Sequence, residues 1–166
     1  MIKVATDWKD YQIIATGDGQ KLEKWGNLVL LRPDPQIIWK SDVPLEKHKA
    51  INAKYIRSNQ GGGRWEYKGN VPDNFTVERK GLKFSLKLMG FKHTGLFPEQ
   101  AVNWDIMQKL ISGSRRQIKV LNLFAYTGGA TVACAKAGAQ VTHVDAAKAM
   151  VDRAKTNANL SGVPSD

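Results

Sequence analysis

The sequence is short of cysteine, of long apolar runs and of any compact cluster of arginine and lysine. Its one cysteine, Cys134, excludes an intrachain disulfide and a zinc site built from cysteine pairs, and we expect no metal site. Cys134 lies in an alanine-rich stretch and is interpreted as a small buried side chain rather than a nucleophile. No apolar run reaches membrane-spanning length, and residues 1–7 do not resemble a signal peptide. These absences favour a cytoplasmic protein with no membrane association.

The sequence has an excess of positively charged residues. Among 166 residues, 25 are lysine or arginine and 15 are aspartate or glutamate, which gives a net charge of +10. Such a surface attracts polyanions, and RNA or DNA is the usual polyanion in a cell. A basic surface that only aids solubility explains the same numbers, so charge alone leaves both interpretations open.

The first part of the chain, residues 1–96, is rich in aromatic and β-branched residues interrupted by turn-forming residues. Alternating patterns predict strands, and a serine–aspartate pair ahead of Pro44 predicts a helix over residues 41–56. We therefore expect a small strand–strand–helix–strand–strand domain with a linking strand over residues 1–96. The predicted strands are residues 11–16, 27–31, 36–40, 64–68, 75–79 and 82–88.

The second part, residues 97–166, changes to a helical period. Pro98 opens a predicted helix in which Val102, Ile106 and Leu110 share one face. An apolar run then predicts a buried parallel strand, followed in alternation by a helix, a strand and a second helix. This order predicts an α/β fold, the opening half of a Rossmann-like doubly wound sheet preceded by a small β-rich α+β domain. Two strands do not complete such a sheet, so we expect residues 97–166 to be its N-terminal part, truncated. The predicted elements are residues 118–124, 130–137, 140–144 and 146–160.

A nucleotide-binding pattern lies within this second part. Gly128 and Gly129 form the turn between the first strand and its helix, where backbone N–H groups favour negatively charged ligands. Asp145 ends the second strand, 23 residues after Asn122, and a carboxylate there can accept both hydroxyls of an adenosine ribose. Asp145 could equally cap the helix that begins at Ala146, and spacing alone leaves both roles open.

The turn departs from the G-x-G-x-x-G fingerprint of dinucleotide sites. Residues 125–130 read Ala-Tyr-Thr-Gly-Gly-Ala, so Tyr126 occupies the space that the fingerprint keeps open for a pyrophosphate. A ligand without phosphates fits this turn better, and S-adenosylmethionine is such a ligand. An NAD-binding oxidoreductase is the alternative that shares the same strand–turn–helix–acid order.

Residues 122–129 and 144–146 resemble class I S-adenosylmethionine-dependent methyltransferases. More narrowly, they resemble the bacterial ribosomal-RNA cytosine-C5 methyltransferases and their relatives, as do residues 93–100. The resemblance implies that S-adenosyl-L-methionine is the cofactor. It places Asp145 at the ribose, Ala146 beside the adenine, Asn122 near the amino group and Gln100 at the polar end of the cofactor. The implied cofactor-binding residues are Gln100, Asn122, Phe124, Ala125, Tyr126, Thr127, Gly128, Gly129, Asp145 and Ala146.

The family's Pro-Pro motif is absent from this sequence, and Cys134 precedes the place of the family's nucleophilic cysteine. We therefore assign no catalytic residue and expect a fragment of an RNA methyltransferase that is inactive alone. A non-catalytic RNA-binding module is the further alternative. We also expect the open edge of the half-finished sheet to invite a partner, such as a second copy of the chain.

Overall fold

The computed structural model describes residues 2–90 and 92–163. Its internal contacts divide the chain into two units. The β unit comprises Trp8–Val77 and Leu86–Thr94, and the α/β unit comprises the described residues of Met1–Asp7, Glu78–Ser85 and Gly95–Asp166. The expected order of two domains stays a prediction. The two units are not separated by a single division at residue 96, because residues of the segments Met1–Asp7 and Glu78–Ser85 belong with the α/β unit.

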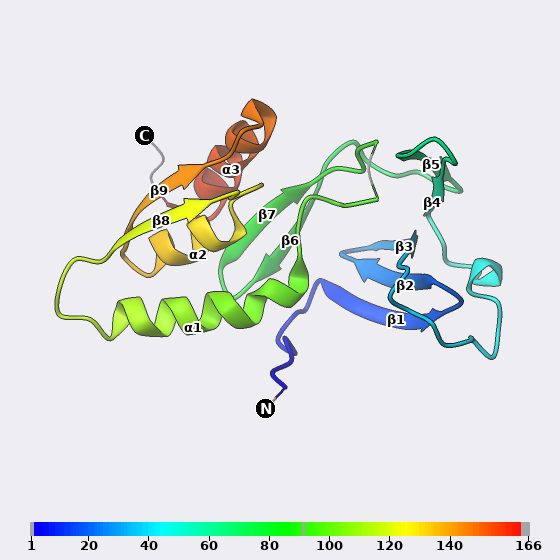
Figure 1. Cartoon of the computed structure of the whole chain (residues 1–166), viewed down its shortest axis with the longest axis horizontal. Coiled ribbons are helices and arrows are strands. Elements are labelled where there is room, and N and C mark those ends of the chain that lie inside the picture. The colour runs from blue at the N-terminus through cyan, green and yellow to red at the C-terminus, as the bar shows by residue number, and fades with distance from the viewer. Residues whose placement is uncertain (1, 91, 164–166) are drawn as a thin grey trace. The chain divides into compact units, whose positions relative to one another are not determined.

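The β unit is built on a five-stranded sheet in the order β1-β2-β3-β4-β5 (Figure 1). All neighbouring strands are antiparallel except β3 and β4, which pair in parallel through Leu30 with Ala53 and Leu31 with Lys54. Every residue of β3 except its last is buried, as expected for a central strand. The strands are β1 (Tyr11–Gly17), β2 (Gln20–Trp25), β3 (Leu28–Pro33), β4 (Ala53–Arg57) and β5 (Gly63–Tyr67).

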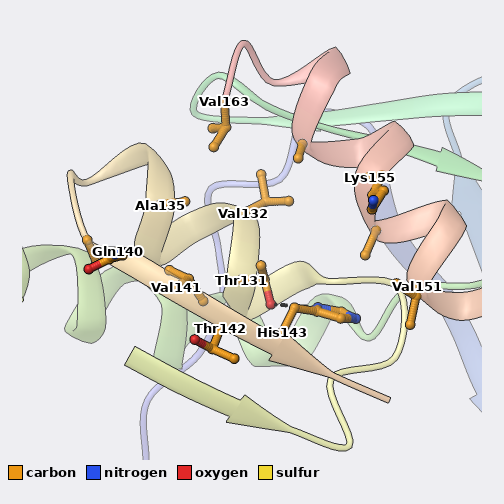
Figure 2. A pocket seen from close by; sticks show the side chains of 13 residues that line it. Thr131, Val132, Ala135, Gln140, Val141, Thr142, His143, Val151, Lys155 and Val163 are labelled. Atoms are coloured by element: carbon orange, nitrogen blue, oxygen red, sulfur yellow. Dashed lines mark hydrogen bonds between the residues drawn. The ribbon is translucent and has the colours of Figure 1, made fainter. Parts of the chain in front are cut away.

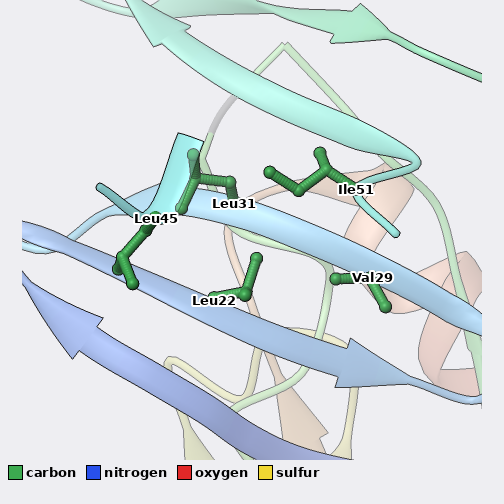
Figure 3. Packing of buried hydrophobic residues seen from close by; sticks show 5 residues of the cluster. All are labelled: Leu22, Val29, Leu31, Leu45 and Ile51. Atoms are coloured by element: carbon green, nitrogen blue, oxygen red, sulfur yellow. The ribbon is translucent and has the colours of Figure 1, made fainter. Parts of the chain in front are cut away.

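Apolar side chains from this sheet and from the segment after β3 make one core cluster (Figure 3). Leu22 of β2 and Leu31 of β3 lie across from each other in register and are fully or almost fully buried. The connecting segment adds Leu45 from the 3₁₀ turn η1 (Leu45–Lys47) and Ile51. The chain thus covers this sheet with a loop that carries two aliphatic residues, where a helix was expected.

A buried ion pair lies in the same unit. Glu23 is fully buried and accepts hydrogen bonds from Arg32 Nε at 2.6 Å and from the Tyr11 hydroxyl at 2.7 Å. Arg32 also donates to the Lys92 carbonyl oxygen at 2.8 Å, and its guanidinium lies 5.5 Å from the centre of the Trp25 ring. Burial has the largest single effect on the Glu23 carboxyl group and opposes its ionisation. The charge and hydrogen bonds of Arg32, together with the Lys21 charge and the Tyr11 hydroxyl, outweigh burial and lower the pKa of this group.

Two predictions for the first part of the chain are wrong, and one strand was not predicted. Residues 36–40 form no strand, and the helix expected over residues 41–56 is replaced by η1 and by β4. The strand β2 was missed, because its charged residues interrupt the apolar alternation. The helical signal failed because β4 pairs with both β3 and β5, so tertiary hydrogen bonding overrides local preference.

Strands β6 (Phe75–Arg79) and β7 (Leu82–Leu86) form a two-stranded sheet, joined by Lys80 and Gly81. Both joining residues have positive φ, 50° and 79°, which is the backbone of a tight type I′ hairpin turn. In the α/β unit, Arg79 donates two hydrogen bonds to the Asp105 carboxylate, at 2.8 and 2.6 Å. This two-pronged ion pair attaches the end of β6 to the helix that carries Asp105.

The α/β unit contains the expected alternation of helices and strands (Figure 1). Strands β8 and β9 pair in parallel from Lys119 with Gln140 to Leu123 with Val144, and α2 lies against both. The α/β fold class is confirmed. The elements are η2 (Pro98–Gln100), α1 (Ala101–Ser112), β8 (Lys119–Leu123), α2 (Gly129–Lys136), β9 (Gln140–Val144) and α3 (Lys148–Leu160).

Burial in this unit differs from expectation at two places. The apolar strand β8 is not buried on both faces: Leu121 is 63% exposed and Leu123 is 53% exposed. In α1 the stripe of Val102, Ile106 and Leu110 does not form the buried face, because Leu110 is 70% exposed. The buried residues of that helix are Ala101 and Trp104, three positions apart.

Helix α3 attaches to the backbone of β7 through side chains spaced four residues apart. Arg153 donates to the Ser85 carbonyl oxygen at 3.2 Å, and Asn157 Oδ1 accepts from the Ser85 N–H at 2.8 Å. Ser161 Oγ accepts from the Lys83 N–H and donates to its carbonyl oxygen, at 2.9 and 3.1 Å. The helical period therefore satisfies backbone groups that alternate along a strand edge.

Candidate cofactor-binding site

The loop between β8 and α2 has an unusual backbone. Phe124, Tyr126 and Gly128 all have left-handed φ angles, of 53°, 51° and 83°. For a residue with a side chain this conformation costs roughly 1–2 kcal/mol, and such costs concentrate at ligand sites. Phe124 and Tyr126, two bulky residues, both adopt the left-handed conformation in this loop. Contacts with the surrounding residues must therefore stabilise the loop.

Asp145 supplies one of those contacts. Its Oδ2 accepts a hydrogen bond from the Tyr126 N–H at 2.8 Å, and its Oδ1 accepts from the Ala147 N–H at 2.9 Å. These two backbone N–H groups lower the pKa of the carboxyl group, so Asp145 is ionised at neutral pH. The carboxylate therefore joins the loop after β8 to the loop after β9.

The cap interpretation of Asp145 is partly right. Helix α3 begins at Lys148 with Ala147 at its N-cap, so Asp145 lies two residues before the cap rather than on it. Its bond to the Ala147 N–H orders the entry to the helix, while its bond to Tyr126 shapes the other loop. A carboxylate offers about four acceptor positions, and two remain for a ligand.

Thr127 is held from two sides and is almost completely buried. Its hydroxyl donates to the Gly95 carbonyl oxygen at 2.5 Å, and its own carbonyl oxygen accepts from Asn157 Nδ2 at 2.9 Å. Asn157 is itself fully buried and bonds to Ser85 through its other amide atom. The loop is thus fixed by groups from α3 and from the segment before η2.

Gly128 and Gly129 both allow close approaches. A Cβ atom on Gly128 would lie 2.8 Å from the Ala154 Cβ atom, and one on Gly129 would lie 2.7 Å from the Trp104 ring. Only glycine allows α2 to start this near α3 and α1. Among the described residues no side chain caps α2, and the first N–H groups of any helix lack an intrahelical acceptor.

These elements enclose a cavity of about 190 Å³. It is open to one side and smaller than a typical cofactor pocket of roughly 300–1,000 Å³. The rings of Phe97 and Tyr126 lie 5.6 Å apart at its rim. Its lining residues are Leu96, Phe97, Gln100, Trp104, Met107, Asn122, Phe124, Ala125, Tyr126, Thr127, Gly129 and Ala130.

Seven of the ten predicted cofactor-binding residues line this cavity. Asp145 does not line it but is bonded to Tyr126, which does. Gly128 is buried behind the loop against Ala154, and Ala146 is exposed and lies off the cavity. The seven lining residues are Gln100, Asn122, Phe124, Ala125, Tyr126, Thr127 and Gly129.

Several residues of this site were not predicted from the sequence. Trp104 could have been found as the apolar residue three positions after Ala101, on the buried face of α1. Asn157 is a polar residue beside Ala158 on the buried stripe of α3, which is itself a signal of an internal hydrogen bond. Nothing in the sequence indicates that Phe97 would face Tyr126.

Cys134 does not line the cavity. Cys134 is buried in α2, and burial raises the pKa of its thiol, which agrees with a packing role. Within residues 2–90 and 92–163, no helix has the length and apolar character needed to cross a membrane. The same described residues include no group of three histidine, cysteine, aspartate or glutamate side chains that could hold a metal ion.

The family model for S-adenosylmethionine-dependent methyltransferases matches residues 46–165. The chain belongs to this family. A ribosomal RNA large subunit methyltransferase K of Neisseria meningitidis is 30% identical over 159 residues, which cover 90% of this chain and 44% of the relative. A ribosomal RNA large subunit methyltransferase K/L of Shewanella frigidimarina is 41% identical over 114 residues, which cover 68% of this chain and 15% of the relative.

Solved structures agree with this membership. A SAM-dependent methyltransferase from Agrobacterium tumefaciens is 37% identical, with a TM-score of 0.86 over 93% of this chain and 50% of that one. A putative methyltransferase complexed with S-adenosylhomocysteine is 22% identical, with a TM-score of 0.69 over 96% of this chain and 44% of that one, and shows the same fold. The coarser of the two expected resemblances, to S-adenosylmethionine-dependent methyltransferases, is confirmed. This methyltransferase chain spans less than half the length of the two curated relatives described above.

Proposed function

We propose that this chain binds S-adenosylmethionine in the loop between β8 and α2, and that the protein containing it methylates RNA. The observation that carries the proposal is the position of Asp145, whose ionised carboxylate shapes the cavity-lining loop through Tyr126. The two acceptor positions left on this carboxylate match the two hydroxyls of a ribose. Asp145 would therefore hold the loop and the sugar with the same group.

The rest of the cofactor can be placed by the chemistry of the cavity. The first turn of α2 offers N–H groups and a positive dipole end, which suit the carboxylate of the methionine part. The aromatic pair of Phe97 and Tyr126 offers an apolar surface at the rim. The cavity is smaller than a whole-cofactor pocket, so it supports a site that holds part of the molecule.

RNA is proposed as the acceptor because the curated relatives are named ribosomal RNA large subunit methyltransferases. The net charge of +10 supports the same choice, since a basic surface attracts a phosphate backbone. The sulfonium supplies the driving force for transfer, and the protein would mainly position donor and acceptor. No residue described here is assigned to the transfer step, and cytosine C5 as the acceptor atom stays a prediction.

The cofactor proposal is tested by calorimetric titration of the chain with S-adenosylhomocysteine, with NAD as the parallel ligand. We expect binding of the first and not of the second. Asp145→Ala should weaken binding at least about tenfold, the effect of losing one hydrogen bond to a charged group. The matched control is Asp152→Ala, which removes an exposed carboxylate of α3 and should leave affinity unchanged.

Two results would contradict this proposal. Binding of NAD alone would favour the oxidoreductase alternative, and equal effects of the Asp145 and Asp152 substitutions would remove Asp145 from the site. The acceptor is tested separately, by following labelled methyl transfer from the whole protein to ribosomal RNA and identifying the modified nucleoside. Salt-dependent RNA binding without methyl transfer or cofactor affinity would favour the non-catalytic RNA-binding alternative. Self-association through the sheet edge also stays a prediction, which sedimentation analysis tests.

A further inference from the structure

Three polar side chains form a hydrogen-bonded chain beneath the cofactor loop. Asn122 of β8 donates from Nδ2 to the Thr131 hydroxyl oxygen at 2.8 Å. The same hydroxyl lies 2.9 Å from Nδ1 of His143 on β9 (Figure 2). All three groups are half-buried, between the strands and α2. Nothing in the cofactor proposal assigns a role to Thr131 or His143.

Thr131 accepts the proton of Asn122 Nδ2, and the roles of its hydroxyl and of His143 Nδ1 depend on the tautomer of the ring. In the neutral tautomer with its proton on Nε2, Nδ1 is an acceptor and Thr131 donates its hydroxyl proton to it. Burial lowers the pKa of His143, against the raising effect of the Asp145 charge, which agrees with a neutral ring. His143 Nε2 is buried and has no hydrogen-bond partner among the described residues.

The hydrogen bond to Thr131 determines which end of the Asn122 amide group is left for a ligand. Because Nδ2 is engaged by Thr131, the other end of the amide, Oδ1, is the atom left for the cavity that Asn122 lines. An amide oxygen accepts a hydrogen bond from an ammonium group, whereas a flipped amide would present two donors to it. The orientation of this one side chain therefore decides between attraction and repulsion of a positively charged ligand group.

We infer that Thr131 and His143 are positioning residues that fix the Asn122 amide so that its oxygen accepts from the ammonium group of the cofactor. This inference rests on the proposed function. It assigns selectivity for the amino-acid part of the ligand to residues that do not touch the ligand. In this arrangement the fixed amide oxygen of Asn122 is a neutral acceptor.

The surroundings of the histidine support a positioning role. His143 and Thr131 also line a second cavity, of about 480 Å³, whose other walls come from α2, α3 and β9 (Figure 2). The charged groups near the ring are Asp145 on the following loop and Lys155 of α3. Neither makes a hydrogen bond to the ring, so Thr131 is the group that sets the tautomer and the ring orientation within the described part of the chain.

The test compares two ligands in the same calorimetric titration: S-adenosylhomocysteine, and 5′-methylthioadenosine, which lacks the amino-acid part. Thr131→Val keeps the side-chain shape but removes both hydrogen bonds. It should weaken S-adenosylhomocysteine binding at least about tenfold, the effect of losing one hydrogen bond to a charged group, and leave methylthioadenosine within about twofold. Thr131→Ser should restore the affinity. The matched control is Thr156→Val, a threonine of α3 whose hydroxyl donates to the Asp152 carbonyl oxygen.

Equal weakening of both ligands by Thr131→Val would overturn the inference, because a merely structural residue acts on both. No weakening of either would overturn it as well. Nitrogen-15 spectra of the unliganded protein test the chain without any cofactor: we expect the Nε2-protonated tautomer of His143 and loss of the protected Asn122 amide signal in Thr131→Val. If the spectra are as expected but neither ligand binds the unsubstituted protein, the proposed function fails and the hydrogen-bond chain alone stands.

Discussion

Replacement of Gly128 by alanine tests the argument that the cofactor loop depends on a close approach between α2 and α3. Gly128 has φ of 83°, and a Cβ atom there would lie 2.8 Å from Ala154 Cβ. Alanine in the left-handed region costs roughly 1–2 kcal/mol. Forcing an extra methyl into a filled space costs a further 1–3 kcal/mol or so. The expected loss in free energy of unfolding is therefore about 2–5 kcal/mol.

Two other glycines separate the two contributions. Gly138 has φ of 98° with no atom within 4 Å of its ideal Cβ position, so Gly138→Ala should show only the backbone cost of roughly 1–2 kcal/mol. Gly129 has no positive φ, but its Cβ would lie 2.7 Å from Trp104. Gly129→Ala should therefore show only the packing cost, about 1–3 kcal/mol.

The measurement is urea unfolding of each variant, followed by circular dichroism and by tryptophan fluorescence. A double-mutant cycle with Ala154→Gly completes it, because this change removes the atom nearest to the new methyl group. In that background the cost of Gly128→Ala should fall to the backbone cost seen at Gly138, roughly 1–2 kcal/mol. If Gly128→Ala costs no more than Gly138→Ala, or if the cycle shows no coupling, the close-approach argument is wrong.

Two further predictions concern charge. Glu23→Gln should lower the free energy of unfolding of the β unit by about 3–5 kcal/mol, because it leaves Arg32 buried without a charged partner; an unchanged urea midpoint would refute this. The second concerns His143, whose pKa burial lowers from 6.5. Since the unfolded chain then binds the proton more readily, stability should fall as pH decreases from 6.5 through the folded pKa. His143→Gln should flatten that part of the pH profile, and an unaltered profile would contradict the shift.

The sequence predicted some elements closely and missed others for identifiable reasons. The strands at residues 75–79 and 140–144 were predicted with their observed bounds, because each is short and rich in β-branched residues between turn signals. The residues of β4 were placed in a helix because the signal that decides them is non-local: their hydrogen-bond partners lie on β3 and β5. A single-sequence pattern carries no information about such partners.

In the candidate site, too, the features set by local sequence spacing were predicted and those set by tertiary contacts were not. The glycine turn and Asp145 were found from spacing, since the strand–turn–helix order brings the ends of β8 and β9 together. That Asp145 would bond to Tyr126, and that Tyr126 would adopt a left-handed backbone, depends on contacts between two loops. The roles of Asn157 and Thr131 likewise depend on which side chains the fold places opposite them.

Asn157 joins two parts of the α/β unit through a single amide group. Its nitrogen holds the Thr127 carbonyl oxygen of the cofactor loop, and its oxygen holds the Ser85 N–H of β7. The loop and the hairpin strand therefore share one anchor, and a displacement of either is transmitted to the other over the width of one side chain. The hairpin does not line the cofactor cavity. A substitution there can nevertheless change the shape of the cavity, because it can shift Asn157 and with it the Thr127 backbone.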